Sequence, residues 1–154
     1  MRQIEGNLKN LLFQSPQVLA VDRDEDNLVL VYQALEMFGY TSVVTQDRQM
    51  AFTLAKMYQP NLILLAISAT HDEDIKLLRS FKDNPQTAKL PIIALTTLTR
   101  VEECDRLRSL GCDNYLCKPY LIEELGTIVA HYIPSHSTHS SWISAFGNFS
   151  EGIA

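Results

Sequence analysis

The stretch Asn61-Leu62-Ile63-Leu64-Leu65-Ala66-Ile67-Ser68 decides the fold of this chain. It is apolar from Leu62 to Ala66, with Pro60 before it and the polar residues 70–74 after it. A short apolar run bounded in this way is typical of a strand buried on both faces, and therefore of the centre of a parallel sheet. In such sheets the functional site lies where the carboxyl ends of the strands open to solvent. On this strand that position is Ala66, whose methyl group offers no chemistry.

Strand-like and helix-like segments alternate along the rest of the chain. Apolar or β-branched runs predict strands at residues 17–21, 41–45, 62–66, 91–96 and 114–117. Apolar periodicity predicts helices at about residues 25–38, 47–58, 72–82, 100–110 and 121–133. Asp24 and Asp47 are placed to cap the first two helices, and residues 99–102 have the form of a capping box. This alternation predicts a single-domain α/β fold with a doubly wound, five-stranded parallel sheet.

Segments at both ends of the chain fall outside this pattern. Residues 1–16 form an N-terminal lead-in, residues 17–133 form the domain, and residues 134–154 form a C-terminal tail rich in Ser and His. Apolar residues of the tail recur at a spacing of four, three and four: Trp142, Phe146, Phe149 and Ile153. This spacing fits one face of a short amphipathic helix, but a tail without fixed structure is an equally good interpretation.

The overall composition narrows the class of protein. The chain has 154 residues, of which 46% are hydrophobic and 20% charged, as in an ordinary globular domain. A net charge of −5 argues against a nucleic-acid partner, because binding to phosphate backbones depends on clustered Lys and Arg. Three cysteines without a CxxC pattern indicate structural thiols in a reduced compartment. With no signal peptide and no long apolar segment, we expect a cytoplasmic protein without a membrane partner.

Four strand ends would meet at the carboxyl edge of the predicted sheet, at Asp22, Ala66, Thr96 and Lys118. With the segments around them, the chain resembles the receiver domain of bacterial two-component response regulators, which has the CheY-like fold. The resemblance covers residues 17–133 and implies the strand order 2-1-3-4-5. The segments that carry it are Val18-Leu19-Ala20-Val21-Asp22, Asn61-Leu62-Ile63-Leu64-Leu65, Pro91-Ile92-Ile93-Ala94-Leu95-Thr96 and Gly111-Cys112-Asp113-Asn114-Tyr115-Leu116-Cys117-Lys118-Pro119-Tyr120.

The resemblance also implies a set of working residues. The family uses an acidic pair after the first strand, a phospho-accepting aspartate after the third, a Thr or Ser after the fourth and a lysine after the fifth. An aromatic residue three positions before the lysine serves as the switch. This chain keeps four of these residues: Asp22, Thr96, Lys118 and the switch aromatic Tyr115. The second acid is replaced by Arg23, and the acceptor is replaced by Ala66.

These replacements remove the chemistry of phosphotransfer. A methyl group at Ala66 cannot form an acyl phosphate. Mg²⁺ needs oxygen ligands, and two of the three expected carboxylates are absent, so we predict no metal, no cofactor and no enzymatic activity. Lys118 is expected to pair with Asp22, although an anion site formed by Lys118, Thr96 and Arg23 is the alternative. The acids at residues 72–74 are most simply the negatively charged first turn of a helix.

Function is then expected to depend on surfaces that bind partners. The helix at residues 25–38 is apolar nearly all round, so a partner surface is predicted at Val29, Tyr32, Met37 and Phe38. Arg106 on the helix at residues 100–110 and Trp142 in the tail are further candidates. The resemblance implies a signalling protein as partner, a histidine kinase or another regulator, and leaves a homodimer open.

Three hypotheses follow for the function. The first is a stand-alone pseudo-receiver that acts by phosphorylation-independent protein–protein interaction. The second is a sensor of an anion or small ligand that enters the pocket beside Lys118 and Thr96. The third is a receiver phosphorylated at a non-standard residue, for which Ser68 or the acids at residues 72–74 are the candidates.

Overall fold

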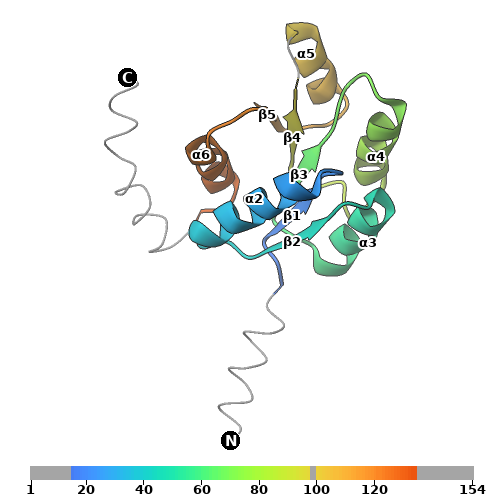
Figure 1. The fold of residues 1–154 in the computed structure, drawn as a ribbon. Coiled ribbons are helices and arrows are strands. Elements are labelled where there is room, and N and C mark those ends of the chain that lie inside the picture. Colours follow the sequence, from blue (N-terminus) through green and yellow to red (C-terminus); the bar gives the residue numbers. More distant parts are fainter. Residues whose placement is uncertain (1–14, 98–99, 135–154) are drawn as a thin grey trace, which may run out of the picture.

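The computed structural model describes residues 15–97 and 100–134 of the chain. Within them, five strands alternate with five helices (Figure 1). The elements are β1 (Val18–Val21), α2 (Glu25–Met37), β2 (Ser42–Thr45), α3 (Arg48–Tyr58), β3 (Leu62–Ala66), α4 (Asp72–Asp83), β4 (Ile92–Thr96), α5 (Val101–Ser109), β5 (Asn114–Cys117) and α6 (Ile122–Tyr132).

All five strands pair in parallel, in the order β2-β1-β3-β4-β5. The prediction of a five-stranded parallel sheet in the order 2-1-3-4-5 is therefore confirmed. The expected caps of the first two helices are present, because the Asp24 and Asp47 carboxylates each accept hydrogen bonds from two backbone N–H groups of their helices. The capping box predicted at residues 99–102 includes a position outside the described residues; in the structure α5 begins after Arg100 without a side-chain cap.

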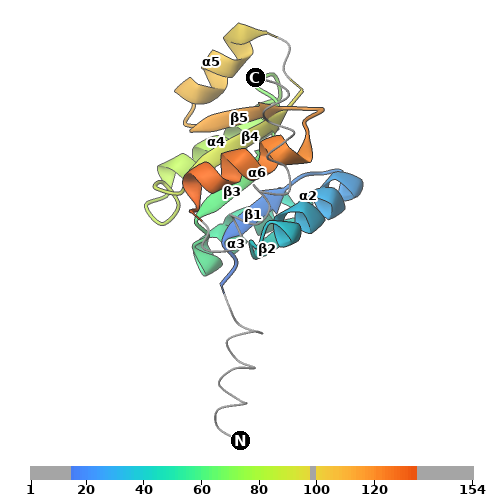
Figure 2. The ribbon, with the colours of Figure 1, turned by 90° about the vertical axis from the view of Figure 1, so that its left-hand side faces the viewer.

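Helices cover both faces of the sheet (Figures 1 and 2), and an apolar core lies between the sheet and the helices on each face. Alternate residues of β3 point to opposite faces, as a two-residue period requires. Leu62 and Leu64 belong to the core beneath α2 and α6, whereas Ile63 and Leu65 belong to the core beneath α3, α4 and α5. All four are fully buried, which confirms that β3 is the central strand. Among the described residues, no helix is both long and apolar enough to cross a membrane.

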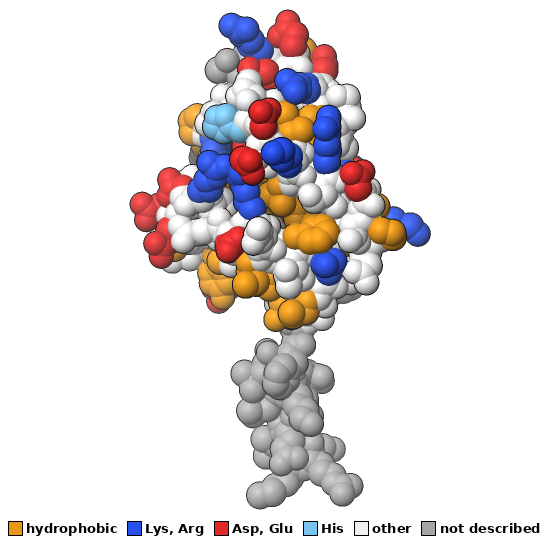
Figure 3. All heavy atoms as spheres, turned by 90° about the vertical axis from the view of Figure 1, so that its right-hand side faces the viewer, with side chains coloured by type: hydrophobic (Ala, Val, Ile, Leu, Met, Phe, Trp, Pro, Cys, Tyr) orange, Lys and Arg blue, Asp and Glu red, His pale blue; other side chains and the backbone are white. Residues whose placement is uncertain are grey.

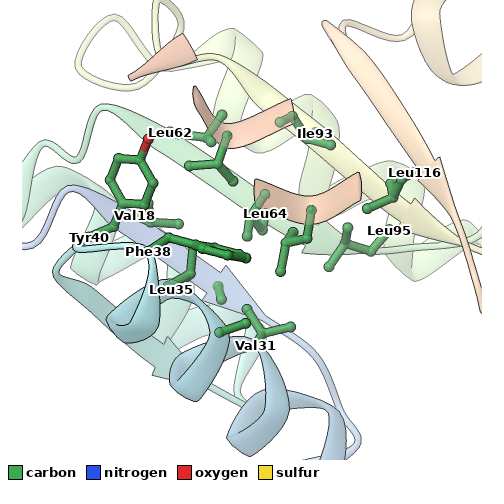
Figure 4. Close-up of a cluster of buried hydrophobic side chains, with 14 of the residues drawn as sticks. Val18, Val31, Leu35, Phe38, Tyr40, Leu62, Leu64, Ile93, Leu95 and Leu116 are labelled. Atoms are coloured by element: carbon green, nitrogen blue, oxygen red, sulfur yellow. The ribbon is translucent and has the colours of Figure 1, made fainter. Parts of the chain in front are cut away.

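The contact between α2 and α6 corrects one predicted partner residue. Phe38 follows the last turn of α2 and is fully buried against α6, with its neighbours in Figure 4. A Cβ atom at Gly126 of α6 would lie 2.8 Å from the Phe38 ring, so glycine lets the helix approach closely. Phe38 therefore belongs to the core and cannot contact a partner. Trp142 lies outside the described residues, as does most of the lead-in.

The strand register aligns the polar residues at one edge. Val21 pairs with Leu65, Ala66 with Leu95 and Thr96 with Cys117. The residues that end or follow these strands therefore share one edge of the sheet.

Candidate functional site

A cavity of about 180 Å³ lies at the carboxyl edge of the sheet. All five residues that the sequence placed there line this cavity: Asp22, Arg23, Ala66, Thr96 and Lys118. Four further polar residues that the sequence did not place there also line it: Arg48, Ser68, Asp74 and Thr97. This cavity is called the edge pocket below.

The first carboxylate of the edge pocket is held by a lysine. Lys118 Nζ lies 2.8 Å from Asp22 Oδ2, and both side chains are more than three-quarters buried. The other Asp22 oxygen accepts a hydrogen bond of 3.0 Å from the backbone N–H of Asp24. The ion pair expected between Lys118 and Asp22 is thus present. Both oxygens of Asp22 are already hydrogen-bonded by groups of this chain.

The second carboxylate comes from α4. The Asp74 side chain is 6% exposed and forms an ion pair with the Arg48 guanidinium at the start of α3. Its Oδ2 accepts a hydrogen bond of 2.8 Å from the backbone N–H of Ser68, in the loop after β3. Asp74 lies in the acidic first turn of α4, as the sequence predicted, but its burial was not predicted. It turns into the pocket because it lies on the apolar stripe of α4, one turn before the buried residues Leu77 and Leu78.

Arg23 lies at the mouth of the edge pocket. Its side chain is 62% exposed, and its Nη2 is 3.6 Å from Asp74 Oδ1. Arg23 lines the same cavity as Asp22 and Lys118, but among the described residues the one carboxylate within ion-pair distance of Arg23 is that of Asp74.

The hydroxyl of Thr96 differs from the other polar groups of the pocket. Thr96 is 2% exposed, and its Oγ1 makes no hydrogen bond to any described residue. Buried hydroxyls nearly always have a partner, so this oxygen marks a place where the pocket could accept one. The backbone carbonyl of Thr96 accepts a hydrogen bond of 2.6 Å from the backbone N–H of Lys118, which holds both residues at the edge of the sheet.

The residues present do not fit the magnesium ion that the family resemblance implies. Among the described residues, no group of three or more His, Cys, Asp and Glu side chains could hold a metal ion. The two carboxylates of the pocket are each paired with a cationic side chain, and a third cation, Arg23, lies at the mouth. An excess of positive charge opposes a dication and favours an anion.

Two tyrosines flank the site without lining it. Tyr115 lies on β5 with the Arg108 guanidinium carbon 5.0 Å from its ring centroid, a cation–π contact. The pKa of Tyr115 is raised, chiefly by its hydrogen bond with the Cys104 side chain. The pKa of Tyr120 is raised mainly by burial and then by the negative charge of Asp22. Tyr115 thus faces α5, and Tyr120 senses the charge of the pocket.

The buried cysteine carries no reactive chemistry. Burial raises the pKa of Cys112 to about 12, so its thiol stays protonated at neutral pH and packs in the core beneath α4 and α5. This agrees with the structural role expected of this thiol.

Two signals in the sequence could have revealed Arg48 and Asp74. Arg48 places a positive charge in the first turn of α3, where the helix dipole favours a negative one. Asp74 lies four residues before Leu78 and seven before Phe81, on the buried stripe of α4. Each is a charge in a position that local structure disfavours. Such a conflict indicates a tertiary partner.

The five-stranded doubly wound sheet in the order 2-1-3-4-5, with a lysine–aspartate pair at its carboxyl edge, has the CheY-like α/β fold. Residues 18–130 match the family model described as response regulator receiver domain, and the chain belongs to this family. Members of the family are signalling proteins that interact with kinases or other regulators. The family membership confirms the coarse function expected from the sequence.

Named relatives and solved structures agree with this assignment. The polar-differentiation response regulator DivK of Brucella anthropi is 27% identical over 116 residues, which cover 75% of this chain and 94% of the relative. The chemotaxis response regulator CheY4 of Vibrio cholerae superposes with a TM-score of 0.69 at 22% identity, over 78% of this chain and all of that one. A response regulator from Desulfuromonas acetoxidans superposes with a TM-score of 0.63 at 26% identity, over 74% of this chain and 93% of that one.

Proposed function

We propose that this chain is a pseudo-receiver, a receiver domain that acts by protein–protein interaction without phosphotransfer at position 66. One observation carries the proposal. The residue at the carboxyl end of the central strand β3 is Ala66, which has no side-chain oxygen to accept a phosphoryl group. The chain is then a signalling module whose state depends on contacts with a partner.

The charges of the edge pocket support this proposal. Asp22 and Lys118 satisfy each other, and Asp74 is paired with Arg48. Neither a metal ion nor a phosphoryl group is needed to balance these side chains. The pocket therefore acts as a fixed structural joint between the sheet and the helices, not as a reaction centre.

The exposed side of α2 is the proposed partner surface. It presents four large apolar side chains that are between 43% and 55% exposed: Val29, Leu30, Tyr32 and Met37. Apolar side chains gathered on one helix mark an interaction site more often than isolated ones do. The proposed partner is a signalling protein, a histidine kinase or another regulator. Arg106 on α5 belongs to a second, mixed-charge face that a second copy of the chain could contact.

Phosphorylation of the intact protein is the direct test. The chain is incubated with acetyl phosphate and Mg²⁺, with a receiver that carries an aspartate at the corresponding position as positive control. Intact-mass spectrometry should show a phosphoryl adduct on the control and none on this chain. A stable adduct on this chain would overturn the proposal.

The partner surface has its own matched control. Met37→Ser on α2 and Met57→Ser on α3 each remove an exposed methionine, 55% and 64% exposed, from different helices of the domain. Complexes captured from the native host should be lost with Met37→Ser and kept with Met57→Ser. Equal loss with both variants would show that the interaction depends on non-specific hydrophobic contacts and not on the surface of α2.

Phosphorylation at a non-standard residue is another candidate function. Among the acids at residues 72–74, Asp74 has the best position to be the acceptor. Asp74 is the only acid of residues 72–74 that lines the edge pocket. Its pairing with Arg48 opposes attack on a phosphoryl donor, because the arginine holds the carboxylate oxygen. An adduct that disappears in Asp74→Asn but persists in Ser68→Ala would support this candidate.

An anion or small-ligand sensor is another candidate function, and the observation in its favour is the Thr96 hydroxyl, which has no hydrogen-bond partner among the described residues. A ligand that accepts or donates a hydrogen bond there would also lie near Lys118. Stabilisation of the unaltered chain by an anion or metabolite, lost in Thr96→Val, would support it.

A further inference from the structure

The second ion pair of the edge pocket has the composition of an anion site that is already filled. The cationic group is the Arg48 guanidinium, the neutral donor is the Ser68 backbone N–H, and the anion is the Asp74 carboxylate. We infer that Asp74 is a built-in ligand that occupies a latent oxyanion site and keeps inorganic phosphate and similar oxyanions out of it. This inference rests on the proposed function in one respect, the lack of a covalent acceptor at Ala66.

The donors of this site come from three separate segments. Arg48 begins α3, Ser68 lies in the loop after β3, and Arg23 follows β1 with its Nη2 at 3.6 Å from the Asp74 carboxylate. One carboxylate from α4 therefore receives contacts from residues of all three segments. Charged acceptors form the stronger hydrogen bonds, so the carboxylate fixes the start of α4 against the sheet.

The ion pair of Asp74 with Arg48 is more deeply buried than a salt bridge on the protein surface. The Asp74 side chain is 6% exposed, and Arg48 is 22% exposed. Figure 3 shows that the face formed by α3 and α4 carries intermixed basic and acidic side chains. Asp74 differs from those exposed acids because it is buried and accepts a hydrogen bond from the backbone N–H of Ser68, a residue outside the helices and strands.

The charge count indicates which ligand would replace Asp74. Three cations, Arg23, Arg48 and Lys118, face two carboxylates, so the pocket carries one excess positive charge. Removal of the Asp74 charge raises the excess to two, which matches the charge of a phosphate ion. The Ser68 N–H and the Thr96 hydroxyl remain as neutral donors on the pocket wall. A tetrahedral oxyanion is the ligand class with several acceptors and this charge.

The inference also assigns a conformational role to Asp74. An oxyanion that entered the wild-type pocket would have to displace the carboxylate, and the first turn of α4 would move with it. The unaltered chain therefore keeps one arrangement of α4 whatever the phosphate concentration. This fixed arrangement of α4 is a physical basis for a signalling domain whose conformation does not depend on phosphorylation.

The test compares two acids on the same turn of α4. Asp74→Ala opens the site, whereas Asp72→Ala removes an equal charge from an exposed position. Each protein is melted in sodium phosphate and in sodium chloride of matched ionic strength. Phosphate should raise the Tm of Asp74→Ala by about 3–5 °C once its concentration is about tenfold above the Kd. The wild type and Asp72→Ala should show no phosphate-specific shift.

A second variant pair separates the outcomes. Asp74→Asn keeps the size of the side chain, so a phosphate effect can still be measured if Asp74→Ala does not fold. Addition of Arg48→Ala to either variant should abolish the phosphate effect. An equal phosphate shift in wild type, or none in both folded Asp74 variants, overturns the inference. These outcomes are non-covalent, so they are distinct from a phosphoryl adduct, which would overturn the proposed function instead.

Discussion

Two carboxylates reach the edge pocket from different layers of the molecule. Asp22 follows strand β1 and meets Lys118, which follows strand β5, so this pair joins two strand ends of the sheet. Asp74 belongs to α4 and meets Arg48 of α3, so this pair joins two helices over one face of the sheet. The difference shows that two parts of the fold build the pocket separately, the strand ends of the sheet and two of the helices that cover it.

The two pairs also differ in the number of groups that depend on them. Asp22 accepts from Lys118 and from one N–H in its own loop. Asp74 accepts from Arg48 and from the N–H of Ser68, with Arg23 nearby, and these groups belong to three segments. Loss of a buried anion leaves each of its donors unpaired. Asp74 with Arg48, the helical pair, should therefore contribute more to stability than Asp22 with Lys118, the sheet pair.

The largest effect is therefore expected from Asp74→Ala. It should lower the free energy of unfolding by about 2–3 kcal/mol, less than for a fully buried ion pair because Arg48 can reach solvent. Urea denaturation checks this value. Asp72→Ala, an exposed acid on the same helical turn, should stay within about 0.5 kcal/mol of wild type. Similar losses in both variants would show that Asp74 contributes only to the helix dipole.

A smaller loss is expected when the sheet pair is broken. Asp22→Ala should cost about 1–2 kcal/mol, because Lys118 is 23% exposed and can turn its ammonium toward water. Asp22→Asn should cost less, since its amide oxygen can still accept the Asp24 N–H. Combination with Lys118→Met measures the coupling between the two charges. A loss with Asp22→Ala that exceeds that of Asp74→Ala would reverse the ranking of the two pairs.

The sequence predicted the sheet pair and missed the helical pair for a physical reason. Asp22 and Lys118 follow strands, and parallel pairing brings strand ends to one edge whatever the helices do. Asp74 and Arg48 meet only because α3 and α4 pack side by side, and no local sequence pattern predicts this packing. The apolar stripe of α4 contained the signal, since Asp74 lies on it, but a run of acids at a helix start has a simpler local explanation.

The exposed faces were predicted less well than the core. Strand positions such as Leu62 and Leu64 are apolar, and burial follows directly. From Leu28 to Phe38 nearly every position is apolar, so periodicity could not separate Val29, which is exposed, from Phe38, which is buried. The burial of Phe38 depends on Gly126 of α6, because the glycine leaves space for the Phe38 ring.

The exposed arginine should contribute least to stability. Arg23 is 62% exposed and lies 3.6 Å from Asp74, which still has Arg48 as its partner. Arg23→Ala should therefore change the free energy of unfolding by less than about 0.5 kcal/mol. Arg48→Ala, measured in the same urea titration, should cost clearly more. Equal effects of the two arginines would mean that Asp74 is shared between them.

The subtlest difference between the carboxylates should appear in the titration of Tyr120. Burial raises the pKa of Tyr120, and the charge of Asp22 raises it further, because a phenolate near a carboxylate is repelled. The folded pKa thus lies above the ordinary value near 10, so stability is lost as the pH rises through it. Asp22→Asn should lower this pKa without restoring the ordinary value, since burial remains, and the alkaline loss of stability should shrink.

Asp74→Asn is the matched control for this titration, because it removes the other charge of the pocket. No contribution of Asp74 to the Tyr120 pKa is found, so the control should leave it unchanged. NMR of ¹³C-labelled tyrosine resolves Tyr120 from the other five tyrosines. If both variants moved the Tyr120 pKa equally, the two carboxylates would act as one electrostatic unit. A shift with Asp22→Asn alone would show that the sheet pair and the helical pair, although they line one cavity, are electrostatically separate.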